Sequence, residues 1–247
     1  MATCMIYMAA GNSRRFGSNK LLHVLDGRPM YLHVLERLAA AAREKEGRVL
    51  LVVTQYPEIM EQVKAMGGFE IPAEPLAGTR CEEEIQTRSC HLASKCMEKE
   101  QLWNQYQAGG ACQSLYAVYS PQSRGGVSYT IRAGLEAARQ VLPCCAGYAF
   151  FTADQPYLSA GTIRQFLDVM ERELPPLGSI CYDGRPGSPT WFAAEYAARL
   201  RALTGDTGGR RILKEYPDAV RYVQAASDRE LWDVDLSKEV LFQERAE

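Results

Sequence analysis

Long apolar segments are missing from this sequence, and so is any strong excess of charge. No apolar run approaches the ~20 residues that a helix needs to cross a bilayer, so we expect no membrane-spanning segment. The 28 lysines and arginines nearly balance the 30 aspartates and glutamates, which leaves a net charge of −2. A chain without a basic field is not expected to bind nucleic acid through bulk electrostatics. Local basic clusters remain compatible with a small phosphorylated ligand.

Basic residues are also missing before the apolar residues of the N-terminal segment Met1–Met8, where a secretory signal would carry them. We therefore expect no export signal, a cytoplasmic protein and reduced thiols. The sequence has eight cysteines, but 47% of its residues are apolar, which is enough for a core without a disulfide framework.

Apolar runs of strand length alternate with helical periodicity along most of the chain. This alternation predicts a mostly parallel sheet with helices on both faces, a Rossmann-like three-layer α/β/α architecture. We expect a turn rich in Gly and Pro at 184–189. Strands are expected at 3–10, 48–54, 114–120, 147–153, 178–182 and 219–224, and helices at 29–45, 57–66, 192–203, after Gly126, after Ser159 and after the loop 205–210.

The alternation is interrupted at residues 72–112, which are polar. We interpret this stretch as an insertion, partly helical, within a single domain that spans residues 1–247. It carries His91 and four cysteines, Cys81, Cys90, Cys96 and Cys112. Their spacing lacks the C-x₂₋₄-C pair that is typical of a structural zinc site. A metal site, a helical flap over the functional site and a protein contact are the alternatives for this segment.

The segment Met8–Lys20 follows the first expected strand and combines glycines with hydroxyl and basic side chains. Glycine lets backbone N–H groups approach a phosphate, while Arg and Lys neutralise its charge. The segment is not a Walker A loop, because Lys20 follows Gly17 by three residues, and it contains no G-x-G-x-x-G fingerprint. A phosphate-binding loop and an ordinary charged surface loop both fit this composition.

Asp154 stands at the end of the expected strand 147–153 and is followed by Gln155 and Pro156. The carboxyl ends of parallel strands share one edge of a sheet, so Asp154 is expected near the loop 11–20. A carboxylate beside a phosphate needs a cation between them, and Mg²⁺ is the usual one. A simple turn aspartate before proline is the alternative.

Two further aspartates, Asp233 and Asp235, alternate near the C-terminus. On an extended segment both carboxylates lie on one face, so either is a candidate for a second metal ligand. We take Asp235 as that candidate, ranked behind Asp154. An exposed acidic edge is the alternative interpretation.

Motifs that cover most of the chain outside 72–112 resemble, in order, those of nucleotidyltransferases related to the molybdenum cofactor enzymes. They are Met8-Ala9-Ala10-Gly11-x-Ser13-x-Arg15-x-Gly17-x-x-Lys20, Gly126 with Thr130 and Gly134, Asp154-Gln155-Pro156, Gly184-Arg185-Pro186-Gly187-Ser188-Pro189, Gly205-Asp206-x-Gly208-Gly209-Arg210 and Asp233-Val234-Asp235. The Ala-Ala-Gly opening resembles the cytidylyl branch of this family more than the guanylyl branch. The resemblance implies the nucleotidyltransferase variant of the α/β fold.

The resemblance also implies a reaction, the Mg²⁺-dependent transfer of CMP from CTP to the terminal phosphate of molybdopterin, with release of pyrophosphate. The phosphate nucleophile needs no general base, because its second pKa near ~6 leaves it mostly ionised at neutral pH. A molybdenum hydroxylase as recipient of the product is implied by the resemblance alone. The alternatives are another phosphorylated acceptor, GTP as the donor, and a non-catalytic carrier of the cofactor.

These roles give a set of candidate site residues. Arg15, Lys20 and Asp154 are the catalytic candidates, and Asp154 and Asp235 are the candidate ligands for Mg²⁺. The candidates for nucleotide binding are Ala9, Ala10, Gly11, Asn12, Ser13, Gly126 and Thr130. The candidates for acceptor binding are Gly184, Pro186, Gly187, Ser188, Asp206 and Arg210.

Overall fold

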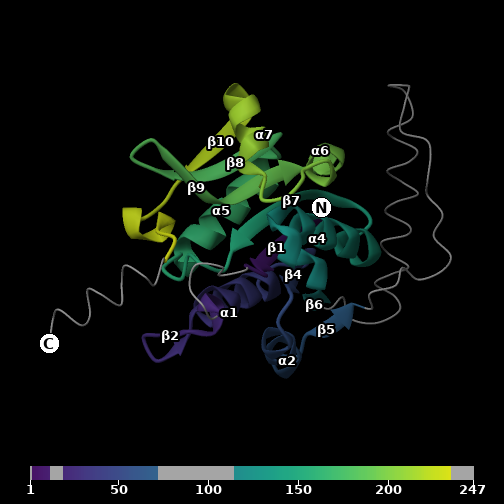
Figure 1. Ribbon diagram of the computed structural model, residues 1–247. Helices are drawn as coiled ribbons and strands as arrows, with labels where there is room; N and C mark the ends of the chain where they lie inside the picture. Colours follow the sequence, from purple (N-terminus) through teal and green to yellow (C-terminus); the bar gives the residue numbers. More distant parts are fainter. Residues whose placement is uncertain (1, 12–18, 72–113, 235–247) are drawn as a thin grey trace, which may run out of the picture.

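An eight-stranded sheet in the order β10-β8-β9-β7-β1-β4-β6-β5 forms the centre of the computed structural model (Figure 1). The structure describes residues 2–11, 19–71 and 114–234. Among the described strands of this sheet, only β9 runs antiparallel to its neighbours, so the predicted mostly parallel sheet is confirmed. The strands are β1 (Ala2–Ala9), β4 (Arg48–Thr54), β5 (Phe69–Ile71), β6 (Leu115–Tyr119), β7 (Cys145–Thr152), β8 (Leu177–Tyr182), β9 (Arg185–Ala193) and β10 (Val220–Gln224).

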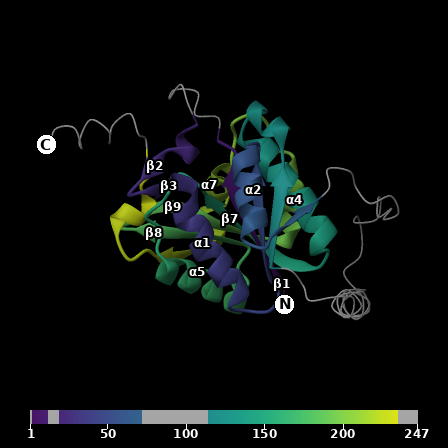
Figure 2. The same ribbon diagram turned by 90° about the horizontal axis from the view of Figure 1, so that it is seen from below.

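Helices cover both faces of this sheet. The first core cluster joins the sheet to α1 (Met30–Arg43), α2 (Pro57–Ala65) and α5 (Ala160–Glu173), and α1 and α5 lie side by side in Figure 2. The second cluster packs α4 (Val127–Val141), α6 (Ala197–Arg201) and α7 (Arg210–Glu215) on the opposite face. A small hairpin of β2 (Val24–Leu25) and β3 (Arg28–Pro29) precedes α1.

The central strands are apolar without alternation because both of their faces are buried. In β1, Met5 and Tyr7 belong to the cluster under α1 and α5, while Cys4 and Ile6 belong to the cluster under α4. All seven residues of β4 are buried as well. The sequence therefore predicted these two strands from their continuous apolar runs.

The predicted turn at 184–189 is wrong, because only its first residue lies in a turn. Asp183 and Gly184 turn the chain with positive φ angles of 49° and 72°, as in a tight β-hairpin. β9 then starts at Arg185 and pairs with β8 and β7. The β8–β9 register shifts between Ser179 and Ile180, which leaves Pro189 in an irregularity where its missing N–H costs no ladder bond.

The helix predicted at 192–203 is also wrong at its start. β9 continues to Ala193, and the α-helical part of this segment is confined to α6. Tertiary pairing with β7 overrides the local helical pattern, since Phe192 lies opposite Tyr148 in that ladder and is buried.

The predicted insertion at 72–112 lies outside the described residues. Within the described ranges, no helix has both the length and the apolar character needed to cross a membrane.

A buried arginine ties the first residue of β4 to α5. The side chain of Arg48 is 3% exposed, and its Nε donates to Glu171 at 2.8 Å while one Nη donates to Asp168 at 2.7 Å. Burial alone would raise the pKa of Glu171, but the hydrogen bonds and positive charges of Arg48 and Lys45 hold that pKa below its ordinary value. The ion pair of Arg48 with Glu171 therefore stabilises the fold as long as Glu171 is ionised.

Replacing Glu171 with alanine should lower the free energy of unfolding at pH 7 by about 2 kcal/mol, because the buried guanidinium of Arg48 loses its charged hydrogen bonds to Glu171 and keeps only the largely exposed Asp168 of its two acidic partners. Since the pKa of Glu171 is lowered in the folded state, its contribution is present above the ordinary carboxyl pKa and is lost as the pH falls through the lowered value. Urea unfolding from pH 7 to pH 3 measures both effects. A deficit that stays constant down to pH 3 would contradict the ionic origin.

Candidate functional site

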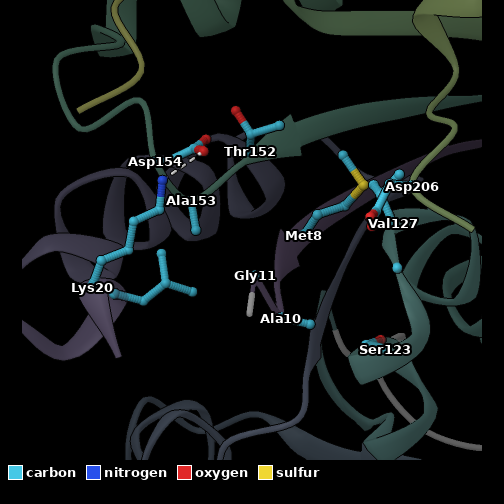
Figure 3. Close-up of a pocket in the computed structure, with 12 residues that line it drawn as sticks. Met8, Ala10, Gly11, Lys20, Ser123, Val127, Thr152, Ala153, Asp154 and Asp206 are labelled. Carbon is cyan, nitrogen blue, oxygen red and sulfur yellow. Dashed lines mark hydrogen bonds and ion pairs between the residues drawn. The ribbon is translucent and has the colours of Figure 1, made fainter. Parts of the chain in front are cut away.

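Two cavities open beside the carboxyl ends of β1 and β7. The first has a volume of about 230 Å³. Loops from neighbouring strands form its wall, and Figure 3 shows their side chains converging on it. Its lining residues are Met8, Ala10, Gly11, Lys20, Leu21, Ser123, Gly126, Val127, Thr152, Ala153, Asp154 and Asp206.

The second cavity, of about 250 Å³, extends toward β9 and the loop before α7. It adds an apolar floor that includes Phe150 and polar groups that include Arg210 and Asp233. The two cavities share five lining residues, Met8, Val127, Thr152, Asp154 and Asp206. Two ligands that occupied the two cavities would therefore meet at Asp154.

Lys20 and Asp154 come together across the first cavity, as the sequence predicted. The ammonium group of Lys20 donates to Oδ2 of Asp154 at 3.1 Å, and the side chains are 20% and 31% exposed (Figure 3). Lys20 opens the 3₁₀ helix η1 (Lys20–Leu22), which Asn19 caps by accepting the N–H of Leu21. This charged pair faces open space in the cavity and can reorganise around an anionic ligand.

A second carboxylate, that of Asp233, lies beside Asp154. Gln155 is 1% exposed and donates from Nε2 to Oδ1 of Asp233 at 2.9 Å. Burial raises the pKa of Asp233 and the charge of Asp154 raises it further, while Arg210, Gln155 and Lys20 lower it, so that it stays above its ordinary value. A carboxylate that is buried beside a second carboxylate attracts a cation, because a positive charge offsets both its burial and the repulsion.

The oxygens around this pair fit a divalent cation. Oγ1 of Thr152 and Oε1 of Gln155 are buried and have no hydrogen-bond partner. In the described part of the chain, no three Asp, Glu, His or Cys side chains are close enough to hold a metal by themselves. Mg²⁺ binds in this manner, through one or two carboxylates together with water and substrate phosphates. Asp233 is thus the described neighbour of Asp154, while the predicted ligand Asp235 lies outside the described residues.

Gly126 brings the start of α4 against the loop before α7. Its φ of 128° and ψ of 172° are accessible to glycine almost alone. A Cβ at this position would stand 2.4 Å from the carbonyl oxygen of Gly205, and the N–H of Ser128 donates to that same oxygen at 3.1 Å. This contact holds Asp206 at the boundary of the two cavities.

Most of the predicted residues that the structure describes line the two cavities. Ala10, Gly11 and Gly126 line the first cavity, and Ser188 and Arg210 line the second. Lys20 lines the first, while Asp154 and Asp206 line both. Asn12, Ser13 and Arg15 lie outside the described residues.

Five of the predicted residues that the structure describes line neither cavity. Ala9 is fully buried, and Thr130 lies behind the first cavity, where its hydroxyl donates to Ser123 at 2.9 Å. Gly184 and Pro186 are exposed at the β8–β9 hairpin, and Gly187 packs against Leu231.

Several lining residues were not among the predicted ones. Thr152, Val127 and Thr190 lie within two residues of predicted positions, so proximity in sequence is the signal that could have found them. Ser123 lies three residues before Gly126, in the 3₁₀ helix η2 (Pro121–Gly125). A helix of that kind has no reliable pattern in a single sequence.

Replacing Gly126 with alanine should lower the free energy of unfolding by about 2 kcal/mol or more, because of its backbone conformation and the clash with Gly205. Gly208 is the matched control, since a Cβ there meets its nearest neighbour, Val127, at an ordinary 3.7 Å. Urea unfolding of both variants measures the difference. Equal stability of Gly126→Ala and Gly208→Ala would contradict the close contact.

Comparison with known proteins places this geometry in a family. Residues 5–82 and 95–220 match the model of the MobA-like NTP transferase domain. A probable molybdenum cofactor guanylyltransferase of Pyrococcus horikoshii is 36% identical over 69 residues, which cover 28% of this chain and 33% of the relative. One from Thermococcus sibiricus is 34% identical over 62 residues, covering 25% and 30%. The matched segment spans about a third of the length of these curated relatives.

Solved structures share the fold over nearly the whole chain. A protein from Mycobacterium tuberculosis H37Rv is 18% identical with a TM-score of 0.59, covering 98% of this chain and 99% of its own. A manganese complex from that organism has a TM-score of 0.55 at 17% identity, with 91% and 89% covered. CMP:2-keto-3-deoxy-manno-octonic acid synthetase, solved with CTP, has a TM-score of 0.59 at 13% identity, with 100% and 99% covered. The predicted nucleotidyltransferase fold is therefore confirmed.

Proposed function

The chain belongs to the MobA-like NTP transferase domain family, and from this premise we propose that it transfers a nucleoside monophosphate to a phosphorylated acceptor with release of pyrophosphate. The observation that carries the proposal is the position of Asp154 on the wall of both cavities. One cavity would take the nucleoside triphosphate and the other the acceptor. The reacting phosphates would then meet where the acidic pair lies.

We propose CTP as the donor and molybdopterin as the acceptor. The Ala-Ala-Gly opening of the first loop supports CTP through its resemblance to the cytidylyl branch. Both curated relatives are named guanylyltransferases, which makes GTP the alternative donor. The second cavity supports a partly apolar acceptor with an anionic group, since Phe150 and Arg210 both line it. A molybdenum hydroxylase would receive the product.

The site would act by neutralising the charge of the phosphates and by aligning the nucleotide with the acceptor. Lys20 would meet the triphosphate, with Arg15, Asn12 and Ser13 of the same loop, while Arg210 would orient the acceptor phosphate. Asp154 and Asp233, with the buried oxygens of Thr152 and Gln155, would hold Mg²⁺. When bound, Mg²⁺ supplies positive charge for the transferring phosphate.

No base has to be assigned for the proposed step. The α-phosphorus of the nucleotide would form a bond to an acceptor phosphate oxygen, and its bond to the pyrophosphate oxygen would break. The acceptor phosphate is already mostly ionised at neutral pH, with a second pKa near ~6. No histidine is among the described lining residues of the two cavities, which fits a step without a proton acceptor.

The experiment that tests this function incubates the protein with Mg²⁺, molybdopterin and each nucleoside triphosphate in turn, and measures pyrophosphate. Release with CTP alone is the expected result, and EDTA should abolish it. Release with GTP alone would move the protein to the guanylyl branch. Binding of the cofactor without pyrophosphate release from any nucleotide would identify a carrier and overturn the proposal.

Asp154→Asn should lower turnover about 100-fold or more, because the variant loses the charge that both cavities share. Thermal unfolding should be nearly unchanged, since Asp154 is partly exposed and its backbone contacts remain. Asp183→Asn is the matched control at the β8–β9 hairpin, where asparagine tolerates the positive φ. Full turnover by Asp154→Asn would remove this carboxylate from the reaction.

A further inference from the structure

Three consecutive side chains at the end of β4 bind three consecutive carbonyls at the end of β1. Oγ1 of Thr54 donates to the carbonyl of Ala9 at 2.8 Å, and Nε2 of Gln55 donates to that of Ala10 at 2.7 Å. The hydroxyl of Tyr56 donates to the carbonyl of Gly11 at 2.6 Å. The backbone pairing of β1 with β4 ends at Ala9 and Thr54, so side chains extend the attachment beyond the last ladder pair. We name these three donors the tether.

The tether is itself held in place by further hydrogen bonds. Oε1 of Gln55 accepts from Nε of Arg124 at 3.1 Å, which fixes the side-chain amide with its NH₂ group toward Ala10. Oγ1 of Thr54 also accepts the N–H of Tyr56 at 3.1 Å. Since Arg124 belongs to η2, the tether connects the loops that follow β1, β4 and β6.

Two of the three bound carbonyls belong to residues that line the first cavity, but their donors do not line it. Ala10 and Gly11 line that cavity (Figure 3), whereas none of the three donors is among its described lining residues. The three carbonyl oxygens are thus directed toward Thr54, Gln55 and Tyr56, and these donors offset the partial negative charge of the oxygens. Because N–H and C=O of a trans peptide unit point in opposite directions, binding the carbonyls of residues 9 and 10 also fixes the N–H groups of Ala10 and Gly11.

We propose that Thr54, Gln55 and Tyr56 are positioning residues that set the backbone of Ala9–Gly11 for a nucleoside triphosphate. The inference rests on the proposed function, because it takes the first cavity as the nucleotide site. The tether acts through the backbone and does not touch the nucleotide. Loosening it should therefore weaken nucleotide binding while leaving the acceptor side unchanged.

Tyr56→Phe is the direct test, because it removes one hydroxyl and leaves the ring. Gly11 is exposed, so water can replace the lost donor and the variant should fold. We expect the KM for the nucleotide to rise about threefold to tenfold, the range that corresponds to one hydrogen bond, with kcat and the KM for the acceptor within about twofold of the wild type. Steady-state pyrophosphate release measures all three values.

Tyr7→Phe is the matched control. The hydroxyl of Tyr7 also donates to a backbone carbonyl at 2.6 Å, but this carbonyl is that of Tyr31 in α1 and not one of those that the tether binds. This variant should lower the melting temperature and leave the KM for the nucleotide unchanged. An equal rise of that KM in both variants would show a general loss of stability and would overturn the positioning role.

Thr54 offers a second test with a built-in rescue. Thr54→Val removes the hydroxyl with little change in shape and should raise the KM for the nucleotide. Thr54→Ser keeps the hydroxyl donor, so its KM for the nucleotide should stay at the wild-type value. If Thr54→Val does not fold, Tyr56→Phe decides alone. If the wild type is active and Tyr56→Phe leaves the KM for the nucleotide unchanged, the positioning role of the tether is overturned and the proposed function stays intact. A wild type inactive with every nucleotide would overturn both.

Discussion

Two carboxylates, those of Asp154 and Asp233, line the second cavity together, and the fold keeps them close to one another despite their repulsion. Asp233 cannot swing away from Asp154, because Gln155 binds its carboxylate and the N–H of Val234 donates to the carbonyl of Asp154 at 2.8 Å. Lys20 and Arg210 lower the pKa of Asp233 but do not restore its ordinary value. The site is therefore preorganised for added positive charge, which a phosphate ligand with a divalent cation brings.

The sheet topology explains why two cavities with different walls adjoin at this place. The first cavity is built from segments that follow β1, β6 and β7, where parallel strands end at a common edge. The second cavity depends on β9, whose antiparallel course brings Ser188 and Thr190 to the same place from within a strand. A purely parallel sheet would offer the edge but not this second wall. Under the proposed function, the reversed strand thus contributes part of the wall of the acceptor site.

Sequence reasoning succeeded where a physical rule has few exceptions. Continuous apolar runs identified β1 and β4, and the shared edge of parallel strands brought Asp154 to Lys20. It failed at β9, because the glycines and prolines of 184–189 are equally typical of a turn and of a hairpin strand with an irregularity. Between Asp233 and Asp235, period-two alternation offers no choice, since both carboxylates share one face. In the described part of the chain, Gln155 binds the carboxylate of Asp233, a tertiary contact that no spacing in the sequence predicts.

The tether was not predictable for a different reason. Its donors bind backbone carbonyls, and every residue has a carbonyl, so no complementary side-chain pattern appears in the sequence. Its consequence is nevertheless specific, because the part of the described cavity wall that follows β1 begins with the small residues Ala10 and Gly11. Small residues leave recognition of a ligand to backbone groups, whose selectivity depends on where the backbone lies. The hydrogen bonds of Thr54, Gln55 and Tyr56 then affect affinity without any contact to the ligand.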